Sequence, residues 1–85
     1  MLGVTALAAA VGALSEKLAR LEKLEISCPG DWVRLDAAVT RTVLAARDEL
    51  QDAPPEALDR EALCDLLDQL RYIKLCTESH LLLQR

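Results

Sequence analysis

Two short proline-containing stretches constrain the fold of this chain more than any other feature of its sequence. They lie at residues 27–30, which end in Pro29 and Gly30, and at residues 52–55, which end in Pro54 and Pro55. Proline interrupts a helix but fits its first turn, and Pro-Gly favours a turn. The sequence therefore predicts three helices, at about 2–26, 32–51 and 55–84, connected by short loops in an up-down-up arrangement.

Length and composition support the same architecture. The chain has 85 residues, which is enough for one small domain but not for two. It contains 18 Leu and 13 Ala, while aromatic residues make up only 2%. Leu and Ala are strong helix formers, whereas sheets draw on β-branched and aromatic residues. We expect a single all-α domain over residues 1–85, built as a helical bundle with coiled-coil-like packing.

The first predicted helix carries apolar residues at alternating spacings of three and four. This pattern is typical of the buried positions of a coiled coil or of a tightly packed bundle helix. The sequence leaves open whether the row folds back onto its own chain or binds another one, and we expect it to bind a partner. The row, called the heptad row below, consists of Val4, Leu7, Val11, Leu14, Leu18 and Leu21.

The other two predicted helices are also amphipathic. Asp31 is expected to cap the start of the second helix, because its side chain can accept a hydrogen bond from a first-turn amide. The apolar arc of the third helix is too wide for one neighbour, so this helix should pack against both others. The stripe of the second helix comprises Trp32, Leu35, Val39, Val43, Ala46 and Leu50, and that of the third Leu58, Ala62, Leu63, Leu66, Leu67, Leu70, Ile73 and Leu81.

The predicted lengths suggest that the third helix extends past the second. At a rise of about 1.5 Å per residue, the two helices span about 45 Å and about 30 Å, which leaves an overhang of several turns. Leu75, Leu82 and Leu83 lie outside the main arc of the third helix. Apolar side chains without an intrachain cover often mark a protein interface. We therefore expect these three leucines and Tyr72, which is a possible aromatic anchor, to bind a partner.

The charge balance argues against nucleic acid as a partner. The formal net charge is −4, and the arginines of the second helix alternate with acidic residues. Residues 2–14 carry no charge, but a membrane-spanning helix needs about 20 apolar residues, so no membrane span is expected. A secretory signal segment is the alternative for this run, although no Lys or Arg precedes it.

Catalytic and metal-binding motifs are missing from the sequence, so we expect neither an enzyme nor a cofactor or metal. Three cysteines without a CxxC pair suggest reduced thiols and a cytoplasmic location. In the up-down-up arrangement, Cys28, Cys76 and His80 come to one end of the bundle. A Cys28–Cys76 disulfide is an alternative there. The same arrangement places Trp32 and Tyr72 at the same height along the bundle, where they either form a layer of the core or anchor a partner.

A helix, a turn at Ala53-Pro54-Pro55-Glu56 and a Leu-rich helix together span about residues 36 to 83. In length, composition and turn position this region resembles the small helical co-chaperones of type III secretion needle subunits. The resemblance implies a helical hairpin that shields an aggregation-prone helical client, and it assigns no functional residue.

Our expectation is a noncatalytic helical module that binds protein through apolar helix faces, as a small subunit or adaptor of a larger assembly. A hetero-complex is favoured over a homo-oligomer. The alternative is a small helical chaperone or co-chaperone for a helical client.

Overall fold

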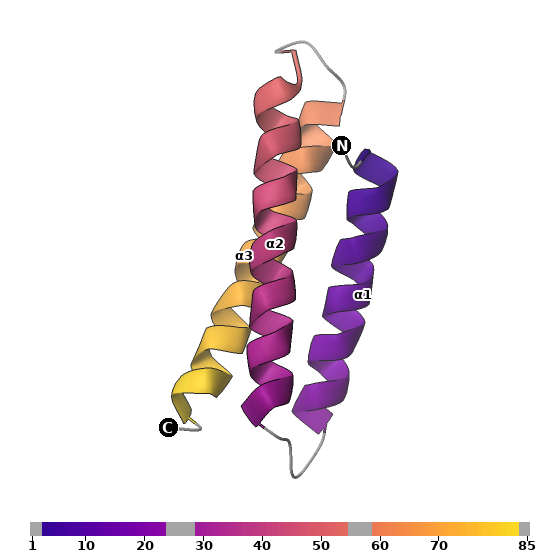
Figure 1. The fold of residues 1–85 in the computed structure, drawn as a ribbon. Coiled ribbons are helices and arrows are strands. Elements are labelled where there is room, and N and C mark those ends of the chain that lie inside the picture. The colour runs from indigo at the N-terminus through magenta and orange to yellow at the C-terminus, as the bar shows by residue number, and fades with distance from the viewer. Residues whose placement is uncertain (1–2, 24–28, 55–58, 84–85) are drawn as a thin grey trace.

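The computed structural model describes residues 3–23, 29–54 and 59–83. It contains three helices, α1 (Val4–Lys23), α2 (Pro29–Asp52) and α3 (Asp59–Leu83). Each helix runs antiparallel to the one before it, so that the three form a rod of 46 × 19 × 18 Å (Figure 1). The predicted all-α, up-down-up arrangement is therefore confirmed. The outermost predicted helix residues, at 2, 24–26, 55–58 and 84, lie outside the described residues.

All three helices contribute to one core, and α2 and α3 share the most extensive contact. The buried residues follow the apolar stripes that the spacing predicts. Thr77 is the one buried polar residue in the described segments, and its hydroxyl donates a hydrogen bond to the Ile73 carbonyl at 2.7 Å. The buried hydrophobic residues are Leu7, Val11, Leu14, Leu18, Leu21, Trp32, Leu35, Val39, Ala46, Leu63, Leu66, Leu67, Leu70 and Ile73.

The second helix begins earlier than the sequence predicts. It starts at Pro29 rather than at residue 32, because proline's fixed φ suits the first turn of a helix. Asp31 consequently lies inside the first turn rather than at the cap, and its carboxylate accepts a hydrogen bond from Arg34 Nη2 at 2.9 Å. Near its described end, α3 lies beside the start of α2, since His80 stacks on Trp32, so within the described residues α3 does not extend several turns past α2.

Arg60 and Lys74 of α3 form hydrogen bonds with α2. Arg60 Nη1 donates hydrogen bonds to the carbonyls of Leu50 and Ala53, at 3.2 and 3.3 Å. The last carbonyls of a helix lack intrahelical partners, so this guanidinium stabilises the end of α2. Further along the pair, Lys74 Nζ contacts Asp36 Oδ1 at 2.7 Å and Thr40 Oγ1 at 2.8 Å. These contacts help to set the register of α3 against α2.

The heptad row packs within its own chain. Leu7, Val11, Leu14, Leu18 and Leu21 are buried against α2 and α3, and Val4 packs partly buried at the edge of the core. The structure thus answers the question that the sequence left open, since the row packs against its own chain, while binding of a partner by this row stays a prediction. Its side chains would reach another protein only if α1 left the bundle.

Candidate functional site: an exposed apolar surface on α2 and α3

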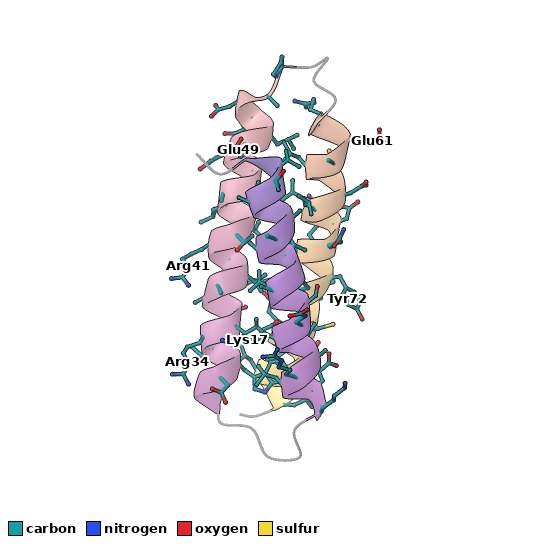
Figure 2. The ribbon with its side chains drawn as sticks, turned by 90° about the vertical axis from the view of Figure 1, so that its right-hand side faces the viewer. Lys17, Arg34, Arg41, Glu49, Glu61 and Tyr72 are labelled. Atoms are coloured by element: carbon teal, nitrogen blue, oxygen red, sulfur yellow. The ribbon has the colours of Figure 1, made fainter. Side chains whose placement is uncertain are left out.

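Four of the predicted partner-binding residues lie on the surface of α3. Tyr72, Leu75, Leu82 and Leu83 have relative exposures of 67%, 64%, 64% and 81%. Figure 2 shows Tyr72 projecting away from the bundle. We call these four residues the apolar band. The band is exposed because its members lie on the outer side of α3, away from the core arc.

Two further exposed apolar residues were missed by the sequence analysis. Val33 and Leu44 of α2 have relative exposures of 55% and 54%. They are eleven positions apart, which is three helical turns, so they share one side of α2. This spacing was a signal available in the sequence, but both residues lie off the main stripe of the second helix and were not considered.

A groove about 470 Å³ in volume lies between α2 and α3. Leu44 and Leu75 line it from opposite helices, with Val43 half-buried between them. No residue of α1 contributes to the lining, because α1 packs against another side of the α2–α3 pair. The groove, called the α2–α3 groove below, is lined by Thr40, Val43, Leu44 and Arg47 from α2 and by Arg71, Lys74 and Leu75 from α3.

The charged residues that line this groove are all basic. Lys74 is already engaged with Asp36 and Thr40, and its Nζ lies 3.7 Å from Glu78 Oε1. Arg71 lies 3.7 Å from Asp68 in a pair whose side chains are both more than 70% exposed, so water screens their attraction. Arg47 is exposed and forms no salt bridge with any residue that the structure describes. The groove thus combines an apolar floor with two available guanidinium groups.

Tyr72, on another side of α3, has a phenol whose pKa is raised above its ordinary value. A side-chain hydrogen bond with Cys76 is the largest cause that raises the pKa of the Tyr72 phenol, and the charges of Cys76 and Glu22 raise the pKa further. Cys76 is half-buried and packs against the core, whereas Cys64 is exposed. Tyr72 is therefore coupled to the end of α1 through Glu22.

Trp32 and Tyr72 do not form a shared layer. Trp32 is buried in the core, and its ring stacks on His80 with a centroid separation of 4.0 Å and an interplanar angle of 12°. His80 Nε2 also lies 3.8 Å from Glu22 Oε2, so α1, α2 and α3 meet at this end of the bundle. Tyr72 remains on the surface, where its role as a partner anchor stays a prediction.

Cys28 lies outside the described residues. The predicted proximity of Cys28 to Cys76 and His80, and the alternative Cys28–Cys76 disulfide, therefore also fall outside them. Within residues 3–23, 29–54 and 59–83, no three His, Cys, Asp or Glu side chains gather where they could hold a metal ion. None of the three helices, as described, combines the length and the apolar character needed to cross a membrane.

Comparisons with protein-family models, curated proteins and solved structures found no match to this chain. The resemblance to type III secretion co-chaperones therefore rests on chain length, composition and the position of the second turn alone.

Proposed function

We propose that this protein is a noncatalytic helical interaction module that binds another protein through apolar side chains on α2 and α3. The observation that supports the proposal is the exposure of six large apolar residues outside a core that is already filled. All six belong to α2 or α3: Val33, Leu44, Tyr72, Leu75, Leu82 and Leu83.

Burial of these residues supplies a driving force for association. Moving one large aliphatic side chain fully out of water stabilises a complex by about 1.5 to 3 kcal/mol. Leu75, Leu82 and Leu83 are each more than 60% exposed, so together they contribute several kcal/mol against the entropic cost of association. A single exposed leucine needs no explanation, but leucines repeated on one side of a helix favour an interface.

The proposed partner is a different protein, and the proposed setting is the cytoplasm. The chain has a net charge of −4, which disfavours self-association through any surface that lacks compensating charge. Cys64 is an exposed free thiol, and such a group remains reduced in a cytosol-like compartment. Within this proposal the protein is a small subunit or adaptor of a larger assembly.

Site-specific photo-cross-linking tests this function in the cells that produce the protein. A photoreactive amino acid replaces Leu75 or Leu82 in two separate variants. The matched control carries it at Glu61, an exposed polar position of α3 (Figure 2). We expect one partner to be trapped from positions 75 and 82 and not from position 61. Equal trapping from all three positions, or none from 75 and 82, would contradict the proposal.

The same cross-links distinguish a permanent subunit from the chaperone alternative. A subunit stays cross-linkable to its partner in the mature assembly, because the interface is part of the final structure. A chaperone is cross-linked to its client before assembly and is released afterwards. We expect the cross-link to persist in the mature assembly, and its loss there would replace the subunit proposal with the chaperone alternative.

A further inference from the structure

We propose that the α2–α3 groove binds an amphipathic helix of the partner whose apolar face is flanked by acidic side chains. This inference rests on the proposed function and specifies the chemistry of the partner. Its three supports are the shape of the groove, the extent of the exposed apolar rows along it and the sign of the charges beside it.

The shape suits a helix. Two antiparallel helices that pack side by side leave a groove between their ridges, into which the side chains of another helix can insert. Here the groove is open and lies away from α1, so a helix bound there would be a fourth member of the bundle. Leu44 and Leu75, both more than half exposed, would contact its apolar face from the two sides.

The exposed apolar rows give the length of the bound helix. Leu75 and Leu82 are seven positions apart in α3, and Val33 and Leu44 are eleven positions apart in α2. Both spacings are close to a whole number of helical turns, so each pair lies on one side of its helix. Because α2 and α3 are antiparallel (Figure 1), Val33 and Leu82 both lie beyond the groove toward the same end of the bundle, on the helix sides of Leu44 and Leu75. From Val33 to Arg47 the surface covers about 21 Å, which is about four turns of a bound helix.

The charges indicate an acidic partner. The whole chain has 14 acidic and 10 basic residues, yet the groove lining contains three basic residues and no acidic one. Lys74 is held by Asp36, so Arg47 and Arg71 are the groups available to a ligand. Guanidinium groups bind carboxylates through paired hydrogen bonds, and these strengthen next to an apolar contact that excludes water.

A second copy of the chain is a poorer occupant than an acidic helix. In a two-fold symmetric contact through this groove, the same patch of each copy faces the other, so arginine would face arginine. An anionic lipid would match the charges as well. The paired apolar rows extend over about four helical turns, however, which fits a rod-shaped ligand better than a lipid headgroup.

Two synthetic peptides test the inference by isothermal titration calorimetry. Both are amphipathic helices of about five turns with leucines on one face, and the flanking residues are Glu in one and Lys in the other. We expect the Glu peptide to bind the wild-type protein about tenfold or more tightly than the Lys peptide. The Arg47→Glu/Arg71→Glu variant should lose about tenfold or more in affinity for the Glu peptide.

The matched control is Arg34→Glu/Arg41→Glu. It changes the net charge by the same amount on the outer side of α2, where Figure 2 shows both side chains pointing away from the other helices. We expect this variant to bind the Glu peptide much as the wild type does. Amide chemical shifts in the wild type should change upon binding at Leu44 and Leu75, and circular dichroism verifies that each variant remains helical.

Equal affinity of the wild-type protein for the two peptides would overturn the proposal that the partner helix is acidic. The proposal would also be overturned if Arg34→Glu/Arg41→Glu lost as much affinity for the Glu peptide as Arg47→Glu/Arg71→Glu does. Binding of anionic phospholipid vesicles without binding of the Glu peptide would overturn it as well. If neither peptide binds while the photo-cross-link at Leu82 is retained, the groove assignment fails and the proposed function stands. If the Glu peptide binds at the groove and no cross-link forms at 75 or 82 in cells, the proposed function fails instead.

Discussion

Tyr72 is exposed, yet its phenol is not independent of its neighbours. The hydrogen bond with Cys76, followed by the charges of Cys76 and Glu22, raises the pKa of this phenol. The folded chain therefore favours the neutral phenol over the phenolate more than the unfolded chain does. Its contribution to stability is complete below the unfolded-state pKa and is lost as the pH rises through the folded-state pKa.

We expect Cys76→Ala to lower the pKa of Tyr72, because the substitution removes the largest cause of the shift. The measurement is an ultraviolet absorbance titration of the phenolate, which is unambiguous because the chain has one tyrosine. The control is Cys64→Ala, which removes an exposed thiol from α3 and should leave the titration unchanged. An unaltered Tyr72 titration in Cys76→Ala would contradict the assigned cause.

At the scale of the helices, α2 and α3 are joined by a half-buried ion pair. Lys74 Nζ and Asp36 Oδ1 are 2.7 Å apart, and their side chains are 30% and 28% exposed. The Arg71–Asp68 pair on the same surface is longer, at 3.7 Å, and lies within one helix. Partial burial reduces screening by water, so the first pair should stabilise the fold more than the second.

A double-mutant cycle on Asp36→Ala and Lys74→Ala is expected to give a coupling free energy of about 1 kcal/mol. The measurement is urea denaturation of the wild type, both single variants and the double variant. The matched cycle on Asp68→Ala and Arg71→Ala should give a coupling close to zero, since both side chains are exposed. Equal couplings in the two cycles would show that burial is not what strengthens the Lys74 pair.

The core stripes were predictable from the sequence, whereas the groove was not. The spacing of Trp32, Leu35 and Val39 is a property of one helix, and all three are buried as predicted. The neighbourhood of Leu44 and Leu75 depends on how α2 and α3 are rotated and shifted against each other. That register is set by long-range contacts such as Lys74–Asp36, which no local pattern encodes.

The extent of α2 was mispredicted for a local reason. Proline at 29 was interpreted as part of a turn, but its ring is equally compatible with the first turn of a helix. As a result α2 starts three residues earlier than predicted, and its first turns lie beside the described end of α3, where His80 stacks on Trp32. The apolar band is still exposed, since exposure of Leu75 and Leu82 depends on their side of the helix rather than on its length.

In the whole molecule, α1 completes a core that α2 and α3 begin. Leu7 and Val11 from α1 are almost fully buried, in the same cluster as Leu35 and Leu70 from the other two helices. A single core shared by three helices is expected to unfold in one cooperative transition. Dissociation of α1 alone would expose apolar surface on all three helices.

We expect Leu7→Ala to lower the free energy of unfolding by about 2 to 5 kcal/mol, because it leaves a cavity in this core. The control is Leu83→Ala, at an 81% exposed position, where the change should stay within about 0.5 kcal/mol. Urea denaturation at two protein concentrations provides the measurement. A wild-type midpoint that shifted with concentration would contradict intrachain packing of α1, because it would indicate association with a second chain.

The stack of Trp32 on His80 gives the protein an intrinsic optical reporter. The chain has one tryptophan, and its indole is 1% exposed at the end of the bundle where α1, α2 and α3 meet. Separation of α3 from α2 at this end would bring the indole into water and move its fluorescence emission to longer wavelengths. Opening of this end can thus be followed in real time without any attached dye.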